Sequence, residues 1–245
     1  MSEPSPGTFR LSEADDANIS QYHALSSLAV AGLVLAVLGP LAMLGPAFWV
    51  IPLAAVVASG AAMWRIVHND PVLTGWKLAQ IGLLLGIVLS VAAPVDWAVH
   101  RRMIRREARD FARLWFDALA DDAPEKAYQL AVHPKLRQPL DNSLWDWYRH
   151  NQRWRLQLEK YVEAPLVRTL LALKTKAEVR YYYCAAQTTG EDGETVDLVY
   201  AVNYEDAEGQ RTFFCNLGLE RLHVDDGRVN WRLVHAEAGF RPPGW

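Results

Sequence analysis

The C-terminal half of this 245-residue sequence carries six side chains that could donate or accept protons in a ligand pocket. They are Tyr128, His133, Asp141, Tyr181, Tyr183 and His235. General acid–base catalysis needs such groups within hydrogen-bond reach of the substrate and with a suitable pKa. The spacing of these residues forms no motif, so they are pocket candidates only, and none is assigned a catalytic role. His235, which follows the predicted strand residues Trp231-Arg232-Leu233, is more simply a packed or surface histidine.

The sequence contains none of the common reactive motifs. A glycine-rich phosphate loop, an HExxH or CxxC pattern and a serine elbow would indicate nucleotide, zinc, redox or acyl-transfer chemistry, and none of them occurs. Cys184 and Cys215 are too few for a disulfide framework and are not spaced like metal ligands. Two buried free thiols are the simpler interpretation, and a cross-strand disulfide is the alternative. We therefore expect no cofactor-binding and no metal-binding residues.

The elements that must position these residues follow from a very uneven distribution of charge. Only three of the 25 Lys and Arg residues, and six of the 28 Asp and Glu residues, precede His100. The mean hydropathy of -0.04 therefore averages a very apolar part and an ordinary hydrophilic part. From residue 100 onward there are 22 charges of each sign. This balance argues against a nucleic-acid-binding protein, which would show a surplus of basic residues.

The first hundred residues are typical of an integral membrane protein. Arg65 is the only ionisable residue between residues 25 and 67, and this length needs two spans because one span takes about 20 residues. With Gly39-Pro40 and Gly45-Pro46 as helix breaks, we predict spans at about 25–44 and 47–67, and a third at about 76–99. The polar residues 1–24 are predicted to be a disordered tail. A cleaved signal peptide does not fit, because the flank is acidic and the apolar run is too long.

Small residues and tryptophans recur in the predicted spans. Gly82, Gly86 and Ser90 are spaced by four residues, which predicts a helix-packing face because small side chains let helix backbones approach closely in lipid. Four tryptophans lie near the predicted span ends, namely Trp49, Trp64, Trp76 and Trp97. Indole rings favour this headgroup region. No span has an ionisable residue near its centre, so the sequence favours a membrane anchor over a transporter.

Three stretches of the N-terminal part carry a family resemblance: Ser27–Leu35, Met63–Ile66 and Leu73–Gly86. They form an apolar run, a basic stretch, and a turn followed by a glycine-containing aliphatic run. In this order they resemble a small bacterial membrane domain family of unknown function, over about residues 25–95. The sequence departs from that family at Trp76-Lys77, where Arg-Gly is typical, and at Gln80. The resemblance implies a membrane-embedded helical unit and supplies no activity.

Residues 100–245 are predicted to form a water-soluble α+β domain. Helices are expected at about 104–119, from Pro124 to about Val132, after Asp141-Asn142-Ser143, and from Pro165 to Leu173. Asp122 and Glu125 are expected to form a capping box for the second helix. After Lys176 the pattern alternates, which predicts helices packed on a curved antiparallel sheet of about four strands. The strands are expected at about 177–189, 195–204, 210–222 and 229–238, with a turn at Asp225-Asp226-Gly227 before the last.

The helical segment Phe111–Leu119, followed by Pro124–Tyr128, resembles the opening of a known fold. This is the cone-shaped fold of nuclear-transport-factor-like proteins, ketosteroid isomerases and small polyketide cyclases, and the resemblance covers about residues 104–240. It implies a pocket lined by the inner sheet face and the third helix, where the six candidates would lie. Because the fold hosts enzymes, binding proteins and inert scaffolds, it supplies no activity.

A basic flank follows the third predicted span. Arg101, Arg102, Arg105 and Arg106 are predicted to attract anionic lipid headgroups. Together with Arg109 they outnumber the two basic residues between the second and third spans, Arg65 and Lys77. This excess favours a cytoplasmic C-terminal domain. In the resembling family, the basic turn between the second and third spans would lie in the cytoplasm. With three spans, this turn and the C-terminal domain lie on opposite sides of the membrane, so the two placements exclude one another.

These observations favour a multi-pass cell-membrane protein whose C-terminal domain is a non-enzymatic binding or assembly module. The alternative is a membrane-tethered enzyme of the isomerase or cyclase type, and a purely structural membrane component is a third possibility. The expected partner is the lipid bilayer. A second copy of the chain, a membrane protein and a small ligand are further possible partners. No nucleic acid is expected. A pocket with a carboxylate or His beside a Tyr would favour the enzyme, and a pocket filled by Trp and Leu the scaffold.

Overall fold

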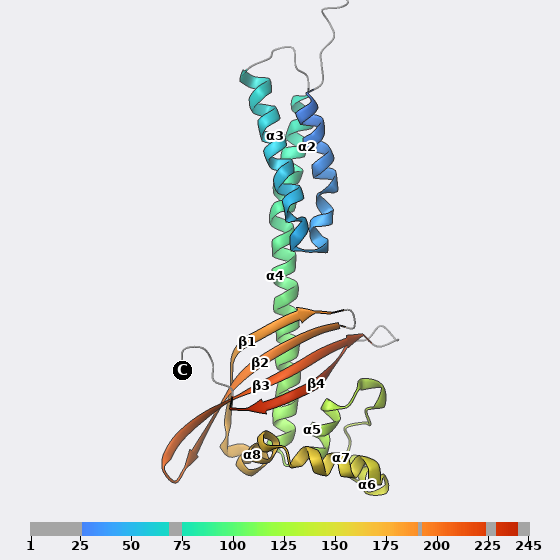
Figure 1. The fold of residues 1–245 in the computed structure, drawn as a ribbon, viewed down its shortest axis with the longest axis vertical. Helices are drawn as coiled ribbons and strands as arrows, with labels where there is room; N and C mark the ends of the chain where they lie inside the picture. The colour runs from blue at the N-terminus through green and yellow to red at the C-terminus, as the bar shows by residue number, and fades with distance from the viewer. Residues whose placement is uncertain (1–25, 69–74, 191–192, 224–228, 240–245) are drawn as a thin grey trace, which may run out of the picture. The chain divides into compact units, whose positions relative to one another are not determined.

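The computed structural model describes residues 26–68, 75–190, 193–223 and 229–239 (Figure 1). The chain divides into an N-terminal unit, Met1–Arg101, and a C-terminal unit, Arg102–Trp245. The predicted tail at 1–24 and the predicted turn at Asp225-Asp226-Gly227 lie outside the described residues. The predicted order of elements, apolar helices followed by helices packed on a four-stranded antiparallel sheet, is confirmed.

Three helical segments that begin in the N-terminal unit are long and apolar enough to cross a membrane. The first consists of α2 (Ser27–Leu38) and the 3-10 helix η1 (Gly39–Leu44). The second consists of η2 (Pro46–Trp49) and α3 (Val50–His68), and the third is α4 (Trp76–Ala120). One Gly-Pro pair begins η1 and the other separates the first two segments, as expected of helix-breaking residues. Helix α4 runs for 45 residues, beyond the predicted span end at residue 99.

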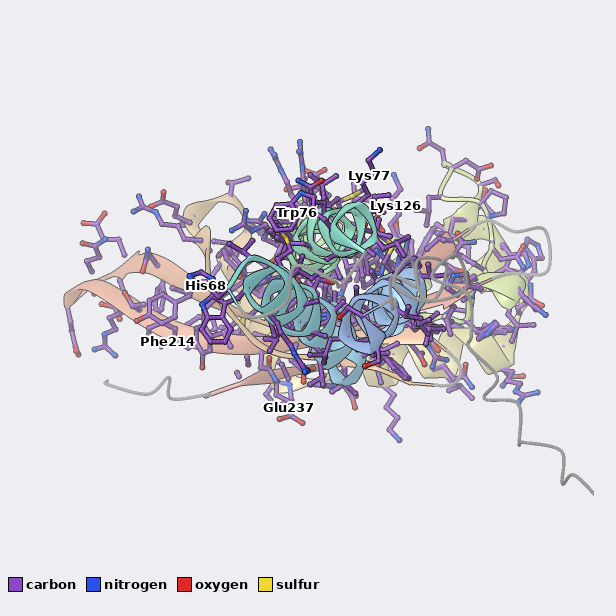
Figure 2. The ribbon with its side chains drawn as sticks, turned by 90° about the horizontal axis from the view of Figure 1, so that it is seen from above. His68, Trp76, Lys77, Lys126, Phe214 and Glu237 are labelled. Atoms are coloured by element: carbon purple, nitrogen blue, oxygen red, sulfur yellow. The ribbon has the colours of Figure 1, made fainter. Side chains whose placement is uncertain are left out.

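Helices α2, α3 and α4 lie side by side in the view along their axes (Figure 2), and small residues lie at their contacts. A β-carbon on Gly82 would lie 2.6 Å from the Ser59 hydroxyl oxygen, and one on Gly86 would lie 3.2 Å from the Val56 amide nitrogen. The hydroxyl oxygen of Ser90 is buried. Fully buried alanines complete these contacts: Ala29, Ala36, Ala55, Ala62 and Ala79. The glycines therefore lie at helix contacts with no room for a side chain.

Aromatic residues lie at both ends of this bundle. Trp49 and Trp97 make an edge-on ring contact at 5.9 Å, and the Arg101 guanidinium lies 4.6 Å from the centre of the Trp97 ring. At the opposite end, His68 ends α3 and Trp76 begins α4 (Figure 2). The 21 residue-to-residue steps from Trp76 to Trp97 rise about 31 Å along a helix, which matches the roughly 30 Å hydrocarbon core of a bilayer.

The C-terminal unit contains the last part of α4 and four further α-helices. These are α5 (Pro124–Ala131), α6 (Leu144–His150), α7 (Gln152–Val162) and α8 (Pro165–Leu173), with a short 3-10 helix η4 (Lys174–Lys176) after α8. The strands are β1 (Glu178–Thr189), β2 (Gly193–Asp206), β3 (Gly209–His223) and β4 (Val229–Ala238). They pair antiparallel in the order β1-β2-β3-β4, so every strand neighbours the next along the chain.

Helices α4, α5 and α8 cover one face of the sheet, which we call the inner face (Figure 1). The predicted apolar stripe of α4 is buried there: Ile104, Ala108, Phe111, Ala112, Trp115 and Leu119. The Trp115 indole nitrogen donates a hydrogen bond of 2.6 Å to the Tyr161 hydroxyl, so this fully buried ring has its polar group paired. On β2, alternate residues from Val196 to Val202 face the same core, as a half-buried strand requires.

Two local predictions are wrong. Asp122 does not cap α5, because its φ of 59° turns the chain away, and its carboxylate makes a 2.8 Å ion pair with Lys174 instead. The helical region predicted after Ser143 is divided into α6 and α7 at Asn151. The Asn151 side-chain amide donates a 2.8 Å hydrogen bond to the Trp147 carbonyl, and such local bonding competes with continuation of the helix.

Cys184 and Cys215 are free thiols. Cys184 lies on β1 opposite Leu198, and Cys215 lies on β3 opposite Tyr200, so strand β2 separates them. Neighbouring strands are about 4.8 Å apart, and two such spacings exceed the roughly 7 Å limit for the α-carbons of a disulfide. A cross-strand disulfide is therefore excluded.

Candidate functional site

The six pocket candidates named from the sequence do not meet in one place. Tyr128 belongs to an aromatic cluster of α5, α6 and α7, where its ring lies 5.1 Å from that of Tyr161. Its hydroxyl donates a 3.0 Å hydrogen bond to the side-chain oxygen of Gln157. Burial raises the pKa of Tyr128, so this hydroxyl is neutral at physiological pH.

His133 and Asp141 stabilise turns in the connection between α5 and α6. The Lys135 amide donates a 3.3 Å hydrogen bond to His133 Nδ1. The Asp141 carboxylate accepts bonds from the Ser143 amide at 2.9 Å and the Ser143 hydroxyl at 2.6 Å. The hydroxyl bond is the main cause of a lowered pKa of Asp141. Both side chains are therefore engaged by nearby backbone.

Tyr183 lies on the outer face of the sheet, opposite the one that α4 covers, and this placement corrects the prediction. Tyr181 pairs with Tyr200, which faces the core, but the register then shifts so that Tyr183 pairs with Val199. A β-bulge of one extra residue, Tyr182, separates the two pairs. Because side chains alternate along a strand, one extra residue moves everything after it to the other face.

His235 is moved to the outer face by a second bulge. Leu233 faces the core, but the register of β3 and β4 shifts before His235, which pairs with Gly218. A β-carbon on Gly218 would overlap the imidazole, so the missing side chain leaves the space in which the ring lies. His235 Nε2 lies 3.7 Å from Asp197 Oδ1 and 3.4 Å from the Asn216 side-chain nitrogen. His235 is therefore absent from the inner face, where the cone resemblance placed it.

Tyr181 borders a groove on the inner face, between α4, the end of α8 and strands β1 and β2. We call it the α4–β1 groove. Its volume of about 650 Å³ lies in the range of small-molecule sites. Its apolar lining consists of Phe116, Leu119, Ala120, Leu170, Ala177 and Val179. Its polar lining comprises residues of α4, together with Lys174, Tyr181 and Tyr200.

Tyr200 is the buried polar residue of this groove, with 5% of its surface exposed. The rings of Phe116 and Tyr181 lie 5.0 Å and 5.8 Å from its own. Its hydroxyl is buried and has no hydrogen-bond partner among the described residues. Leaving such a group unpaired costs about 1–3 kcal/mol. Burial raises the pKa of Tyr200, so the hydroxyl is a neutral donor at physiological pH.

Helix α4 places three arginines along the groove, because residues three and four apart share a helix face. The Arg109 guanidinium lies 4.9 Å from the centre of the Tyr181 ring. Arg113 forms an exposed ion pair of 3.7 Å with Asp117. Arg106 is exposed and has no ion-pair partner in the part of the chain that the structure describes.

Lys174 borders the groove in a strained backbone conformation. Its φ is 48° and that of Asp122 is 59°, and among the described residues these are the two non-glycine residues with positive φ. The ion pair between their side chains is therefore a link between two strained positions. Strain of this kind costs about 1–3 kcal/mol and recurs at functional sites. Lys174 directly follows the end of α8, where a residue with positive φ commonly terminates a helix.

The four arginines predicted to meet lipid headgroups take different positions. Arg101 lies over the Trp97 ring in the N-terminal unit. Arg102 is exposed and Arg105 is half-buried. Arg106 borders the α4–β1 groove, so this residue is available to a ligand of the C-terminal unit.

A second cavity, of about 750 Å³, lies along α6 and α7. Its lining includes Trp145, Leu158 and Val162, which makes it largely apolar. Its buried hydroxyl, that of Tyr148, accepts a 2.7 Å hydrogen bond from the Gln129 side chain. It therefore offers a ligand no unpaired hydroxyl like that of Tyr200.

The α4–β1 groove is suited to binding more than to proton transfer. It offers guanidinium groups and a neutral hydroxyl donor beside an apolar wall, whereas its carboxylates, Asp110 and Asp117, are exposed. Among the described residues, no three His, Cys, Asp or Glu side chains gather as metal ligands. Tyr200 was not among the pocket candidates selected from the sequence. The available signal was a hydroxyl within a series of inward-facing aliphatic residues.

Comparison with known proteins adds no family to this geometry. The resemblances to a bacterial membrane domain and to the cone-shaped fold therefore stay predictions from the sequence. No protein-family model matches the chain, and no curated protein sequence matches it significantly.

Proposed function

We propose that this protein is a membrane-anchored binding module whose C-terminal unit holds a small ligand in the α4–β1 groove. The observation that carries the proposal concerns Tyr200, which borders the groove and whose buried hydroxyl has no hydrogen-bond partner among the described residues. A ligand that accepts its hydrogen bond would remove a cost of about 1–3 kcal/mol. The guanidinium groups of Arg106 and Arg109 supply charged donors in the same groove.

We propose that the three helices long and apolar enough to cross a membrane are the anchor of a multi-pass protein of the cell membrane, and their length and composition support this. The basic residues of α4 beyond the third predicted span are more numerous than Arg65 and Lys77, and this excess favours a cytoplasmic C-terminal unit. A reporter enzyme that is active only outside the cytoplasm, fused after Trp245, tests this orientation. We expect it to be inactive, and an active fusion would reverse the orientation.

The binding function is tested by purifying the full-length protein in detergent and identifying retained small molecules by mass spectrometry. We expect Tyr200→Phe to lower the retained amount, because a hydrogen bond to a charged group is worth about 1.5–3 kcal/mol, or roughly a tenfold to hundredfold change in affinity. The matched control is Tyr182→Phe, since Tyr182 is exposed on the outer face. Equal retention by both variants would contradict the proposal.

A membrane-tethered isomerase or cyclase is the second candidate function. It is favoured by the presence of one carboxylate, Asp110, in the same groove as the Tyr181 and Tyr200 hydroxyls. In such an enzyme Tyr200, kept neutral by its raised pKa, would donate to a developing oxyanion while Asp110 accepted a proton. Asp110→Asn separates the two functions, because it would abolish turnover of a candidate substrate in the enzyme and leave ligand retention intact in the binding module.

A further inference from the structure

The arginines of the α4–β1 groove that form no ion pair among the described residues and the apolar residues of the groove lie at different positions along α4. Arg106 and Arg109 lie roughly two to three and a half helical turns before Phe116 and Leu119. The other cations of the lining are already neutralised, since Arg113 pairs with Asp117 and Lys174 pairs with Asp122. The two ends of the groove therefore differ in the ligand groups they can accept.

The end of the groove at Arg106 and Arg109 is suited to an anion. Asp110 is the acidic residue of the lining nearest to them along α4, so the three side chains leave one net positive charge. The Tyr200 hydroxyl adds a neutral donor, and Arg109 and Asp110 are among the charged groups that act on it. A carboxylate or phosphate oxygen would satisfy this hydroxyl and the uncompensated guanidinium charge together.

The opposite end is lined by Leu119 and Ala120 of α4, Leu170 of α8 and Val179 of β1. These residues come from three elements and form an apolar wall that a small inorganic anion would not use. Burial of alkyl groups on such a wall is favourable in proportion to the apolar surface removed from water. A ligand that uses both ends must therefore carry an anionic group and an apolar body.

We propose that the ligand of the α4–β1 groove is a single-chain anionic amphiphile. Its carboxylate or phosphate head lies at Arg106, Arg109 and the Tyr200 hydroxyl, and its alkyl chain lies along Leu119, Leu170 and Val179. This inference rests on the proposed binding function, and it adds the chemical class and the orientation of the ligand. The membrane anchor keeps the C-terminal unit tethered to the bilayer in which such molecules are concentrated.

The test uses the full-length protein in nanodiscs of phosphatidylcholine, which has no net charge. The probe is a 16-carbon fatty acid with a photoreactive diazirine at its terminal carbon, and labelled peptides are mapped by mass spectrometry. Because the terminal carbon should lie at the apolar end, we expect adducts in residues 116–120 and 166–179. Competitors are the saturated fatty acids from 8 to 12 carbons, dodecyl phosphate, dodecanol, inorganic phosphate and 2-naphthoate.

The orientation and the class predict a definite pattern of competition. Each added methylene should improve competition about fourfold, from the burial of roughly 0.8 kcal/mol per methylene. Dodecyl phosphate should compete, dodecanol should compete at least tenfold more weakly because it lacks the anionic head, and inorganic phosphate, which lacks the alkyl chain, should not compete. Arg109→Ala and Tyr200→Phe should each weaken labelling of the groove tenfold or more. Arg153→Ala, which removes an exposed arginine on α7, should leave it unchanged.

Failure of the ligand class and failure of the binding function have different signatures. If 2-naphthoate or inorganic phosphate reduces labelling of the groove peptides and the alkyl anions do not, the ligand is not an anionic amphiphile. The proposed binding function would still stand. If dodecanol competes as well as dodecyl phosphate, the anionic head is overturned. If adducts fall only within residues 27–99, and no competitor changes the groove peptides, the amphiphile and the binding function both fail.

Discussion

Lys174 and Asp122 are joined by a 2.8 Å ion pair although both have a left-handed backbone that non-glycine residues rarely adopt. The ψ of Lys174 is -133°, which together with a φ of 48° is a combination found essentially in glycine. The exposed ion pair contributes about 0–1 kcal/mol, so it does not offset the strain. The folded protein is thus less stable with lysine at position 174 than it would be with glycine there.

We therefore expect Lys174→Gly to be more stable than Lys174→Ala by about 1 kcal/mol, because both lose the ion pair and glycine alone relieves the strain. Lys176, two residues later, has no positive φ and is the matched control. There the order should reverse, with alanine more stable by about 0.5 kcal/mol or more. Chemical denaturation of the four variants measures both differences. The same order at both positions would contradict the strain at Lys174.

Gly82→Leu should destabilise the N-terminal helices, because a β-carbon at this position already lies 2.6 Å from the Ser59 hydroxyl oxygen. Overpacking of this kind costs about 1–3 kcal/mol, and more where the neighbour is backbone. Gly60→Leu is the matched control, since nothing lies within 4 Å of a β-carbon there. Thermal unfolding of the full-length variants in one detergent compares them. Equal midpoints would place Gly82 outside the packing face.

Gly218→Ala should displace the His235 ring from the outer face and destabilise the C-terminal unit by about 1–3 kcal/mol. In a His235→Ala background the same change should cost much less, because the overlapping ring is gone. A double-mutant cycle on unfolding free energies isolates this coupling. Additive effects would mean that the ring does not occupy the space above Gly218.

The Cys215 thiol should resist alkylation in the folded protein. Burial raises its pKa to about 12, so the reactive thiolate is almost absent at pH 8. In a Cys184→Ala background, we expect iodoacetamide to modify Cys215 after urea unfolding and not before, as read by mass spectrometry. Rapid modification of the native protein would show that the core around β3 opens readily.

The raised pKa of Cys215 also makes the free energy of unfolding depend on pH in the alkaline range. Since the folded pKa is raised above an unfolded value of about 8.5, the stabilising contribution is complete below that pH and is lost as pH rises towards 12. The unfolding free energy of the wild type should therefore fall by up to about 1.4 kcal/mol per pH unit more than that of Cys215→Ala above pH 9. Parallel pH profiles would contradict the burial of the thiol.

The strands could be predicted from the sequence because alternation and turn residues are local signals. The faces of Tyr183 and His235 could not, since the bulge residues Tyr182 and Val234 look like ordinary strand residues. Each shifts the alternation by one residue, and a pattern read from Tyr181 or Leu233 then assigns the wrong face. The register depends on pairing with the neighbouring strand, which a single strand does not encode.

The α4–β1 groove could not be predicted from the sequence for a related reason. Arg109 and Tyr200 are 91 residues apart, and the groove exists only because α4, α8, β1 and β2 converge. Helical spacing does place Arg106, Arg109 and Arg113 on one face of α4, but it does not say what that face meets. An unpaired buried hydroxyl is likewise a property of the packed fold, because pairing depends on every neighbour.

The tryptophans of α4 also bear on which membrane the protein would occupy. If Trp76 and Trp97 both lie in headgroup regions, their separation of about 31 Å sets a preferred hydrocarbon thickness. The edge-on contact of Trp97 with Trp49 opposes sliding of α4 past the second apolar segment. A bilayer several ångströms thicker would have to thin around the protein, at a fraction of a kcal/mol per ångström. Under that condition, the separation of the two indoles would favour membrane regions of about this thickness over thicker ones.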